Sequence, residues 1–185
     1  MKVILFSVIA LGAAFAVFFV AVRRAQRRLP PIVLAPGEKL PTTPIQRLAQ
    51  WCLVLTLLPT LAAAGVVVSH GPRVWWDSDP VRLSATGLLL LALGVYAVYG
   101  VRIGIWAARD DGTLDERDRA ILASAPAGQA PAIIVTLAAW MIGLIGAYPG
   151  AGAVPKVFLY LIFWSCLMMS VLALLAGVVI GYRRS

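Results

Sequence analysis

Five long runs of apolar residues, separated by short polar segments, dominate the pattern along this chain. The first run, residues 3–22, holds no charged residue, and further runs follow at about 48–69, 83–107, 132–148 and 157–182. Because an α-helix rises ~1.5 Å per residue, about 20 residues cross the ~30 Å hydrocarbon core of a bilayer. The pattern therefore predicts an all-α fold: a polytopic transmembrane helical bundle of about five spans, forming a single membrane domain over residues 1–185.

The composition supports a lipid bilayer as the environment of these runs. Hydrophobic residues make up 61% of the chain and charged residues 13%, whereas a typical water-soluble domain has about 45–50% and about 25%. The net charge of +8 could indicate nucleic acid. However, Lys and Arg cluster at the ends of the apolar runs, where membrane topology places them, so we expect no nucleic-acid partner.

The distribution of basic residues predicts the orientation of the bundle. With the amino terminus outside, twelve Lys and Arg residues lie on the inner face and four on the outer face. The inner set is Arg23, Arg24, Arg27, Arg28, Lys39, Arg47, Arg102, Arg109, Arg117, Arg119, Arg183 and Arg184, and the outer set is Lys2, Arg73, Arg82 and Lys156. The positive-inside rule then favours an N-out/C-in, multi-pass protein of the bacterial inner (cytoplasmic) membrane.

The first run also has features of a signal peptide. Ala14-Phe15-Ala16 has the small-x-small form of a cleavage site, but the apolar run continues directly after it through Val20. We therefore interpret residues 3–22 as an uncleaved span, and whether residues 1–16 are removed stays open.

Several local signals lie within and between the apolar runs. Pro59 lies within the second run, where a proline removes one helical hydrogen bond. Residues 70–82 are expected to form a loop in which Trp75 and Trp76 act as interfacial anchors. Thr113 and Glu116 match a capping box and predict a short inner-face helix over about 114–124.

That short helix has predicted contacts and a predicted end. Asp115 and Arg119 stand four residues apart, which allows an ion pair on one helix face. Pro126, Gly128 and Pro131 mark the end of the helix before the next span.

Two segments of the carboxyl-terminal part of the chain resemble a group of other proteins. They are Asp115-Glu116-Arg117-Asp118-Arg119-Ala120-Ile121 before a span, and Leu159-Tyr160-Leu161-Ile162-Phe163-Trp164-Ser165 with the ending Gly181-Tyr182-Arg183-Arg184. Together they resemble uncharacterised small bacterial multi-span inner-membrane proteins with a DERDRAI-like loop. The resemblance covers about the last 75 residues and implies a membrane domain, but no activity and no site residue.

Few residues suit chemistry inside a membrane, which usually needs ionisable or metal-binding side chains facing the bundle interior. The chain has one histidine, His70, and its two cysteines, Cys52 and Cys166, lie in apolar runs as sheltered thiols. All eight acidic residues are assigned to loops: Glu38, Asp77, Asp79, Asp110, Asp111, Asp115, Glu116 and Asp118. We therefore predict no catalytic residue, no metal site and no cofactor.

Two kinds of site remain as candidates. Gly100 with Gly104, and Gly177 with Gly181, match the GxxxG spacing that lets helices approach closely, either within the chain or at a subunit interface. Arg102, Asp115, Glu116 and Arg119 could form a docking site at the inner face. The alternatives are that Arg102 only extends to the interface and that the short helix is only solvated.

These observations rank three functions. The first is a non-catalytic accessory or structural subunit that packs against a larger membrane complex or against itself. The second is a small oligomeric transporter or channel, which Pro59 favours. The third is an enzyme acting on lipids through Asp110, Asp111 and Asp115. Whether the chain is an enzyme, its substrate, its partner, its oligomeric state, and any bound pigment, quinone or lipid stay open.

Overall fold

The computed structural model describes residues 43–108, 115–148 and 154–184, and in these ranges every regular element is a helix. Four segments there are long and apolar enough to cross a membrane: Pro44–His70, Asp79–Ile103, Glu116–Gly146 and Lys156–Arg183. The predicted all-α transmembrane bundle is therefore confirmed, and the chain is an integral membrane protein. The predicted first span, residues 3–22, lies outside the described residues.

Helix α2 (Pro44–His70) begins four residues before its apolar run because of a local capping signal. The Thr43 side chain accepts a hydrogen bond from the backbone N–H of Gln46 at 3.2 Å, and Pro44 occupies the first turn, where its missing N–H costs nothing. The helix continues through Pro59 and ends at Gly71, whose φ of 80° favours glycine.

The segment expected to be a loop at residues 70–82 is mostly helical, which corrects the sequence prediction. Helix α3 (Pro72–Asp77) follows Gly71 directly, and helix α4 (Asp79–Ala108) begins after Ser78. Asp77 and Asp79 therefore lie in helices rather than in a loop. Pro72 and Pro80 in the first turns explain the difference, because proline starts helices as readily as it interrupts them.

The connection between the short inner helix and the next span also differs from the prediction. Helix α5 (Glu116–Ser124) runs through the 3-10 turn η1 (Ala125–Gly128) into helix α6 (Gln129–Ala147) without an interruption. Pro126 and Pro131 lie in the first turns of η1 and α6, so they do not end the helical path. Glu116 and Asp118, assigned to a loop by sequence, belong to α5.

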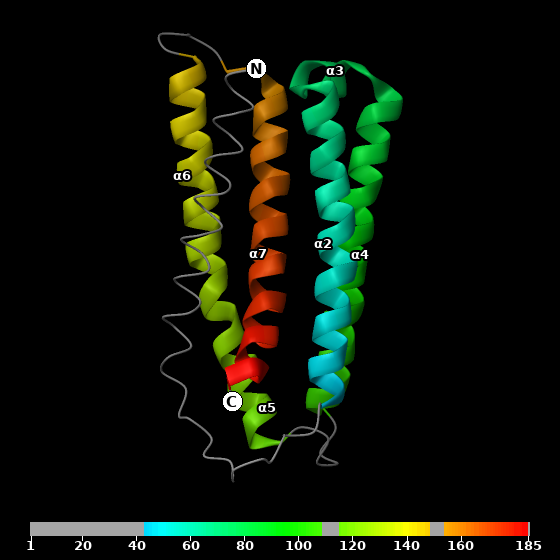
Figure 1. Cartoon of the computed structure of the whole chain (residues 1–185), viewed down its shortest axis with the longest axis vertical. Coiled ribbons are helices and arrows are strands. Elements are labelled where there is room, and N and C mark those ends of the chain that lie inside the picture. The colour runs from blue at the N-terminus through cyan, green and yellow to red at the C-terminus, as the bar shows by residue number, and fades with distance from the viewer. Residues whose placement is uncertain (1–42, 109–114, 149–153, 185) are drawn as a thin grey trace.

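Helix α7 (Lys156–Arg184) is the central helix of the described bundle. It contacts α2, α6, η1 and α5. Of the residues in its most apolar 18-residue stretch, 56% are buried, against 11–22% in the corresponding stretches of the other three spans. In Figure 1, α6 and α7 form one pair and α2 and α4 the other, with α3 at one end and α5 at the opposite end. The two ends are called the α3 end and the α5 end below.

The buried side chains form clusters near the two ends, while the outer faces remain apolar. The α5-end cluster includes Tyr99, Ile121, Leu175 and Tyr182, and the α3-end cluster includes Trp75, Ala63, Ala85, Val157 and Phe158. Trp75 is 1% exposed, so it packs in the core and is not the interfacial anchor that its position predicted. Leu58, Leu91 and Ile142 are among the large apolar side chains that face outward, as lipid contact requires.

Candidate functional site

Helix α5 and turn η1 lie against the carboxyl-terminal part of α7, and two glycines make this approach close. A Cβ atom added to Gly177 would lie 2.9 Å from the backbone oxygen of Ala125, and one added to Gly181 would lie 2.8 Å from Cγ2 of Ile121. No side chain larger than hydrogen fits at Gly177 unless the backbone of η1 moves. The GxxxG pair Gly177 and Gly181 therefore lies at a contact within the chain.

A buried polar pair fastens the same contact. Asp118 is 3% exposed, and one of its carboxylate oxygens accepts a hydrogen bond from the hydroxyl of Tyr182, which is 4% exposed. Arg117 Nη2 donates to the backbone oxygen of Tyr182 at 3.3 Å, and its guanidinium carbon lies 5.4 Å from the centroid of the Tyr182 ring. Polar groups this deeply buried need such partners, so the pair specifies how α5 sits on α7.

The amino terminus of α5 begins later than the capping box predicted. The N-cap is Asp115, whose side chain accepts from the backbone N–H of Asp118 at 2.6 Å, while Thr113 lies outside the described residues. Asp is at least as good an N-cap as Thr, so the helix starts at Glu116 instead of Leu114. The Asp115 carboxylate is used in this cap, and the ion pair predicted with Arg119 is absent from the described part of the chain.

The outward face of α5 carries two of the predicted docking residues. Glu116 and Arg119 are exposed, as are Ala120 and Ala123 on the same side of the helix, whereas Asp118 and Ile121 are buried on the opposite side. Asp115 is exposed beside them. The start of this helix thus presents a small-residue surface flanked by two negative charges, Asp115 and Glu116, and one positive charge, Arg119.

The other predicted residues are not brought to this contact. Gly100 is exposed with no atom within 4 Å of an added Cβ, so it packs against no described helix. The surroundings of Gly104 lie outside what the structure describes. Arg102 is exposed near the end of α4. The four predicted docking residues therefore lie in two places: Asp115, Glu116 and Arg119 at α5, and Arg102 near the end of α4.

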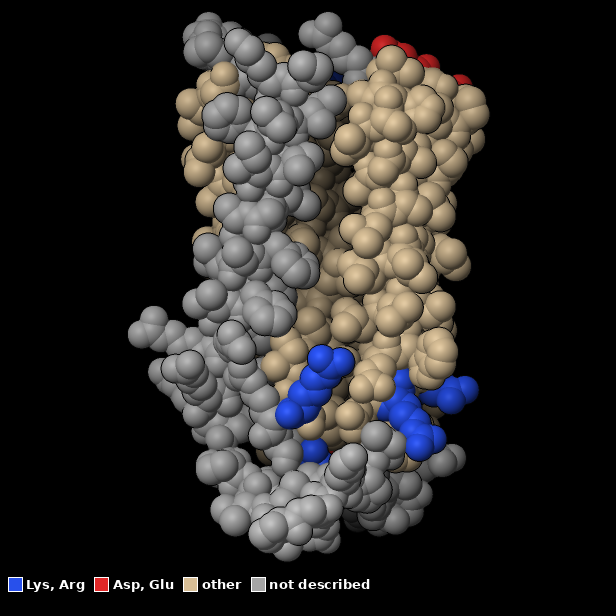
Figure 2. Space-filling view, viewed as in Figure 1, with Lys and Arg blue, Asp and Glu red and all other residues tan. Residues whose placement is uncertain are grey.

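Charge is distributed unevenly between the two ends of the described bundle. On the face shown in Figure 2, Lys and Arg side chains gather toward the α5 end and acidic side chains toward the α3 end. The described basic side chains of the α5 end are Arg47, Arg102, Arg117, Arg119 and Arg183, and those of the α3 end are Arg82 and Lys156. The candidate site thus lies at the basic end.

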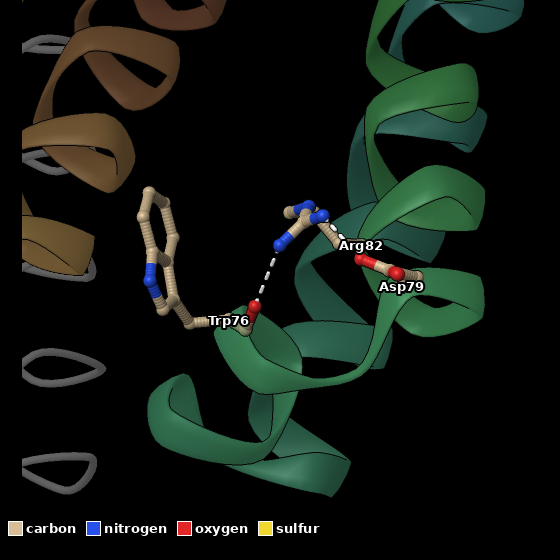
Figure 3. A network of polar contacts seen from close by, with 3 residues as sticks. All are labelled: Trp76, Asp79 and Arg82. Carbon is tan, nitrogen blue, oxygen red and sulfur yellow. Dashed lines mark hydrogen bonds and ion pairs between the residues drawn. The ribbon is translucent and has the colours of Figure 1, made fainter.

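A second polar network joins α3 to α4 at the other end (Figure 3). Arg82 Nη1 donates to the backbone oxygen of Trp76 at 2.8 Å, and Arg82 Nη2 donates to the carboxylate of Asp79. The Arg82 guanidinium carbon also lies 5.9 Å from the centroid of the Trp76 ring. The Arg82 and Asp79 side chains are 38% and 74% exposed, so solvent screens this ion pair and it contributes little to the stability of the fold. Its role is to hold the turn between α3 and α4 in position.

Sequence reasoning missed the two residues that the structure makes most prominent at the candidate site, Asp118 and Tyr182. A signal for Asp118 was present, because Asp118, Ile121 and Ala125 follow the i, i+3, i+7 spacing of one helix face. That spacing places the carboxylate on the apolar side of α5. Within the described ranges, no group of three or more His, Cys, Asp and Glu residues is placed to hold a metal ion.

The arrangement is suited to holding α5 in a defined position on α7. Its buried polar atoms are occupied with one another, and its exposed charges lie on the outward face of α5. The resemblance to proteins with a DERDRAI-like loop stays a prediction. Comparison of this chain with protein-family models, with curated proteins and with solved structures gives no match.

Proposed function

We propose that this integral membrane protein is a non-catalytic accessory or structural subunit of a larger membrane complex in the bacterial inner membrane. In this proposal the α5 end faces the cytoplasm and the outward face of α5 binds the partner. The observation that supports this proposal is that the two sides of α5 differ, one being bonded to α7 and the other being exposed. Its inner side is fastened to α7 through Asp118 and Tyr182, and its outer side presents Glu116 and Arg119 around exposed alanines.

Two physical arguments support a docking role for this surface. Helix α5 continues through η1 into α6 and also packs on α7, so both its continuity with a long helix and this packing hold it rigid. A preorganised surface loses less conformational entropy on binding than a flexible one. Small residues flanked by opposite charges would let a partner helix approach closely and would fix its register.

The proposal can be tested by site-specific photocrosslinking in native membranes. Replacing Ala120 by the photoreactive residue p-benzoylphenylalanine should give a discrete product of higher mass, because Ala120 lies in the centre of the exposed face. A matched control replaces Ile134, which is 64% exposed on α6 and faces lipid. Partner products from Ile134 alone, or only lipid adducts from both positions, would contradict the proposal.

A transporter or channel that acts as an oligomer is the second candidate. It is favoured by polar side chains along the inward face of α2 beside Pro59, namely Cys52, Thr56 and Thr60. Flux of a broad panel of solutes in proteoliposomes tests this candidate. No flux above protein-free vesicles would remove it.

A further inference from the structure

Two arginines stand where α2 and α4 reach the membrane boundary at the α5 end. Arg47 lies in the first turn of α2, and Arg102 is the last residue but one of the apolar span Asp79–Ile103. Both side chains are exposed. These helix ends pack together, because Ile45 of α2 shares a buried cluster with Tyr99 of α4. Figure 2 shows basic side chains over this end of the α2 and α4 pair.

No acidic residue of the two helices lies at this end to offset the charge. Helix α2 contains no Asp or Glu, and the only one in α4 is Asp79 at the opposite end, where it pairs with Arg82. Among the described residues, no carboxylate forms an ion pair with Arg102. A charge beside the hydrocarbon core is costly unless a counter-charge or water meets it. The end of this helix pair is therefore suited to an anion from outside the protein.

The face of α2 that continues from Arg47 changes stepwise from charged to apolar. Trp51 stands four residues after Arg47, and Leu55 and Leu58 follow on the same helix face. Trp51 is 67% exposed, and it is the only exposed one of the six tryptophans, all of which the structure describes. An outward indole near a span end suits the level where headgroups meet acyl chains. Leu55 and Leu58 are exposed deeper in the span, where acyl chains lie.

We infer that the surface formed by Arg47, Trp51 and Arg102, called the arginine surface below, binds an anionic phospholipid. The guanidinium groups contact the phosphate, with which arginine forms charge-assisted and often bidentate hydrogen bonds. The acyl chains lie along the exposed leucines that continue from Trp51. This surface is distinct from the outward face of α5, and the inference does not depend on the docking role proposed for that helix.

Net charge and acyl chains together define this ligand. A zwitterionic phospholipid offers the same phosphate but adds a cationic group that the arginines repel, so the arginine surface prefers a lipid with net negative charge. A free phosphate ion has no acyl chain and gains nothing from the exposed apolar side chains. Selectivity for a lipid of net negative charge is therefore the property to measure.

Native mass spectrometry of the full-length protein in mild detergent identifies bound lipids by their mass. With equal amounts of dioleoyl phosphatidylglycerol and dioleoyl phosphatidylcholine, adducts of the anionic lipid should predominate. Arg102→Gln should weaken its binding about fivefold, the usual contribution of one basic residue at a membrane surface. Arg47→Gln repeats the test on the other helix. The matched control is Lys156→Gln, which removes one exposed charge at the α3 end and should leave the preference unchanged.

The same measurement distinguishes the arginine surface from a general effect of charge. Arg102→Lys keeps the charge and should restore most of the preference, and circular dichroism checks that each variant is folded. Equal adducts of the two lipids on the unsubstituted protein would overturn the inference. So would equal losses for Lys156→Gln and Arg102→Gln, or no loss for either arginine variant. Displacement of the lipid by an excess of inorganic phosphate would also overturn it, because the ligand would then be a phosphate ion.

Discussion

At the scale of single residues, burial decides which polar contacts matter in this protein. The Asp118–Tyr182 pair and the Asp79–Arg82 pair each join a carboxylate to a donor, yet the first is almost fully buried and the second lies in solvent. A donor removed from a buried pair leaves the acceptor without water or protein to replace it. The contact at the α5 end should therefore be far more sensitive to substitution than the one at the α3 end.

Tyr182→Phe should lower the free energy of unfolding by about 1–3 kcal/mol, because it leaves the Asp118 carboxyl buried without its donor. The measurement is thermal or denaturant unfolding in mild detergent, followed by circular dichroism. Asp79→Asn is the matched control and should change the free energy by at most about 1 kcal/mol. Equal losses for the two variants would show that the Asp118–Tyr182 bond does not act as a buried pair.

At the scale of elements, α7 organises the bundle because its neighbours approach it on several sides. Small residues allow this, and the glycines at positions 177 and 181 receive η1 and α5 directly. Gly94 and Gly100 of α4 have the opposite surroundings, since an added Cβ at either position meets nothing within 4 Å. Glycine thus allows close helix packing on α7, whereas on α4 it lies at the exposed surface without such a contact.

Gly177→Ala should destabilise the protein by about 1–3 kcal/mol, because the new methyl group would meet backbone atoms of Ala125 that cannot rotate away. Gly94→Ala is the matched control in the same kind of helix. It should be neutral or stabilising by up to about 1 kcal/mol, because alanine favours the helix and has free space there. Unfolding in detergent compares them, and a tolerated Gly177→Ala would mean that η1 is not held against α7.

At the scale of the whole molecule, the uneven charge of the two ends bears on orientation in the membrane. Basic side chains are concentrated at the end formed by α5 and the carboxyl terminus. Lys and Arg near span ends are retained on the cytoplasmic side of a bacterial inner membrane. The N-out/C-in prediction follows from this rule and places the outward face of α5 in the cytoplasm.

Labelling of single cysteines tests that orientation. In a background where Cys52 and Cys166 are replaced by Ala, we expect a membrane-impermeant maleimide to label Val74→Cys on intact spheroplasts. Val74 is 53% exposed in α3, at the end predicted to face outward. Ala120→Cys in α5 should react only after the membrane is permeabilised. The reverse pattern would contradict the orientation and would remove the cytoplasmic docking surface with it.

Much of the helical framework could be predicted from sequence, and its errors have local causes. The apolar runs located all four described spans because their length matched the bilayer. The predicted helix boundaries were wrong where a proline was interpreted as a helix breaker but in fact lies in the first turn of a helix. This holds for Pro72, Pro80 and Pro131. Residues of this kind interrupt or begin a helix according to their neighbours.

The sequence by itself determined that this chain is a helical membrane protein, because in lipid a backbone must satisfy its hydrogen bonds within its own helix. Only the tertiary structure decided what each polar or small residue does there. Gly177 and Gly100 begin the same motif, and Asp118 and Asp79 are the same residue type. Their roles differ because contact and burial depend on the neighbouring helix, and periodicity along one helix does not specify which face that neighbour will cover.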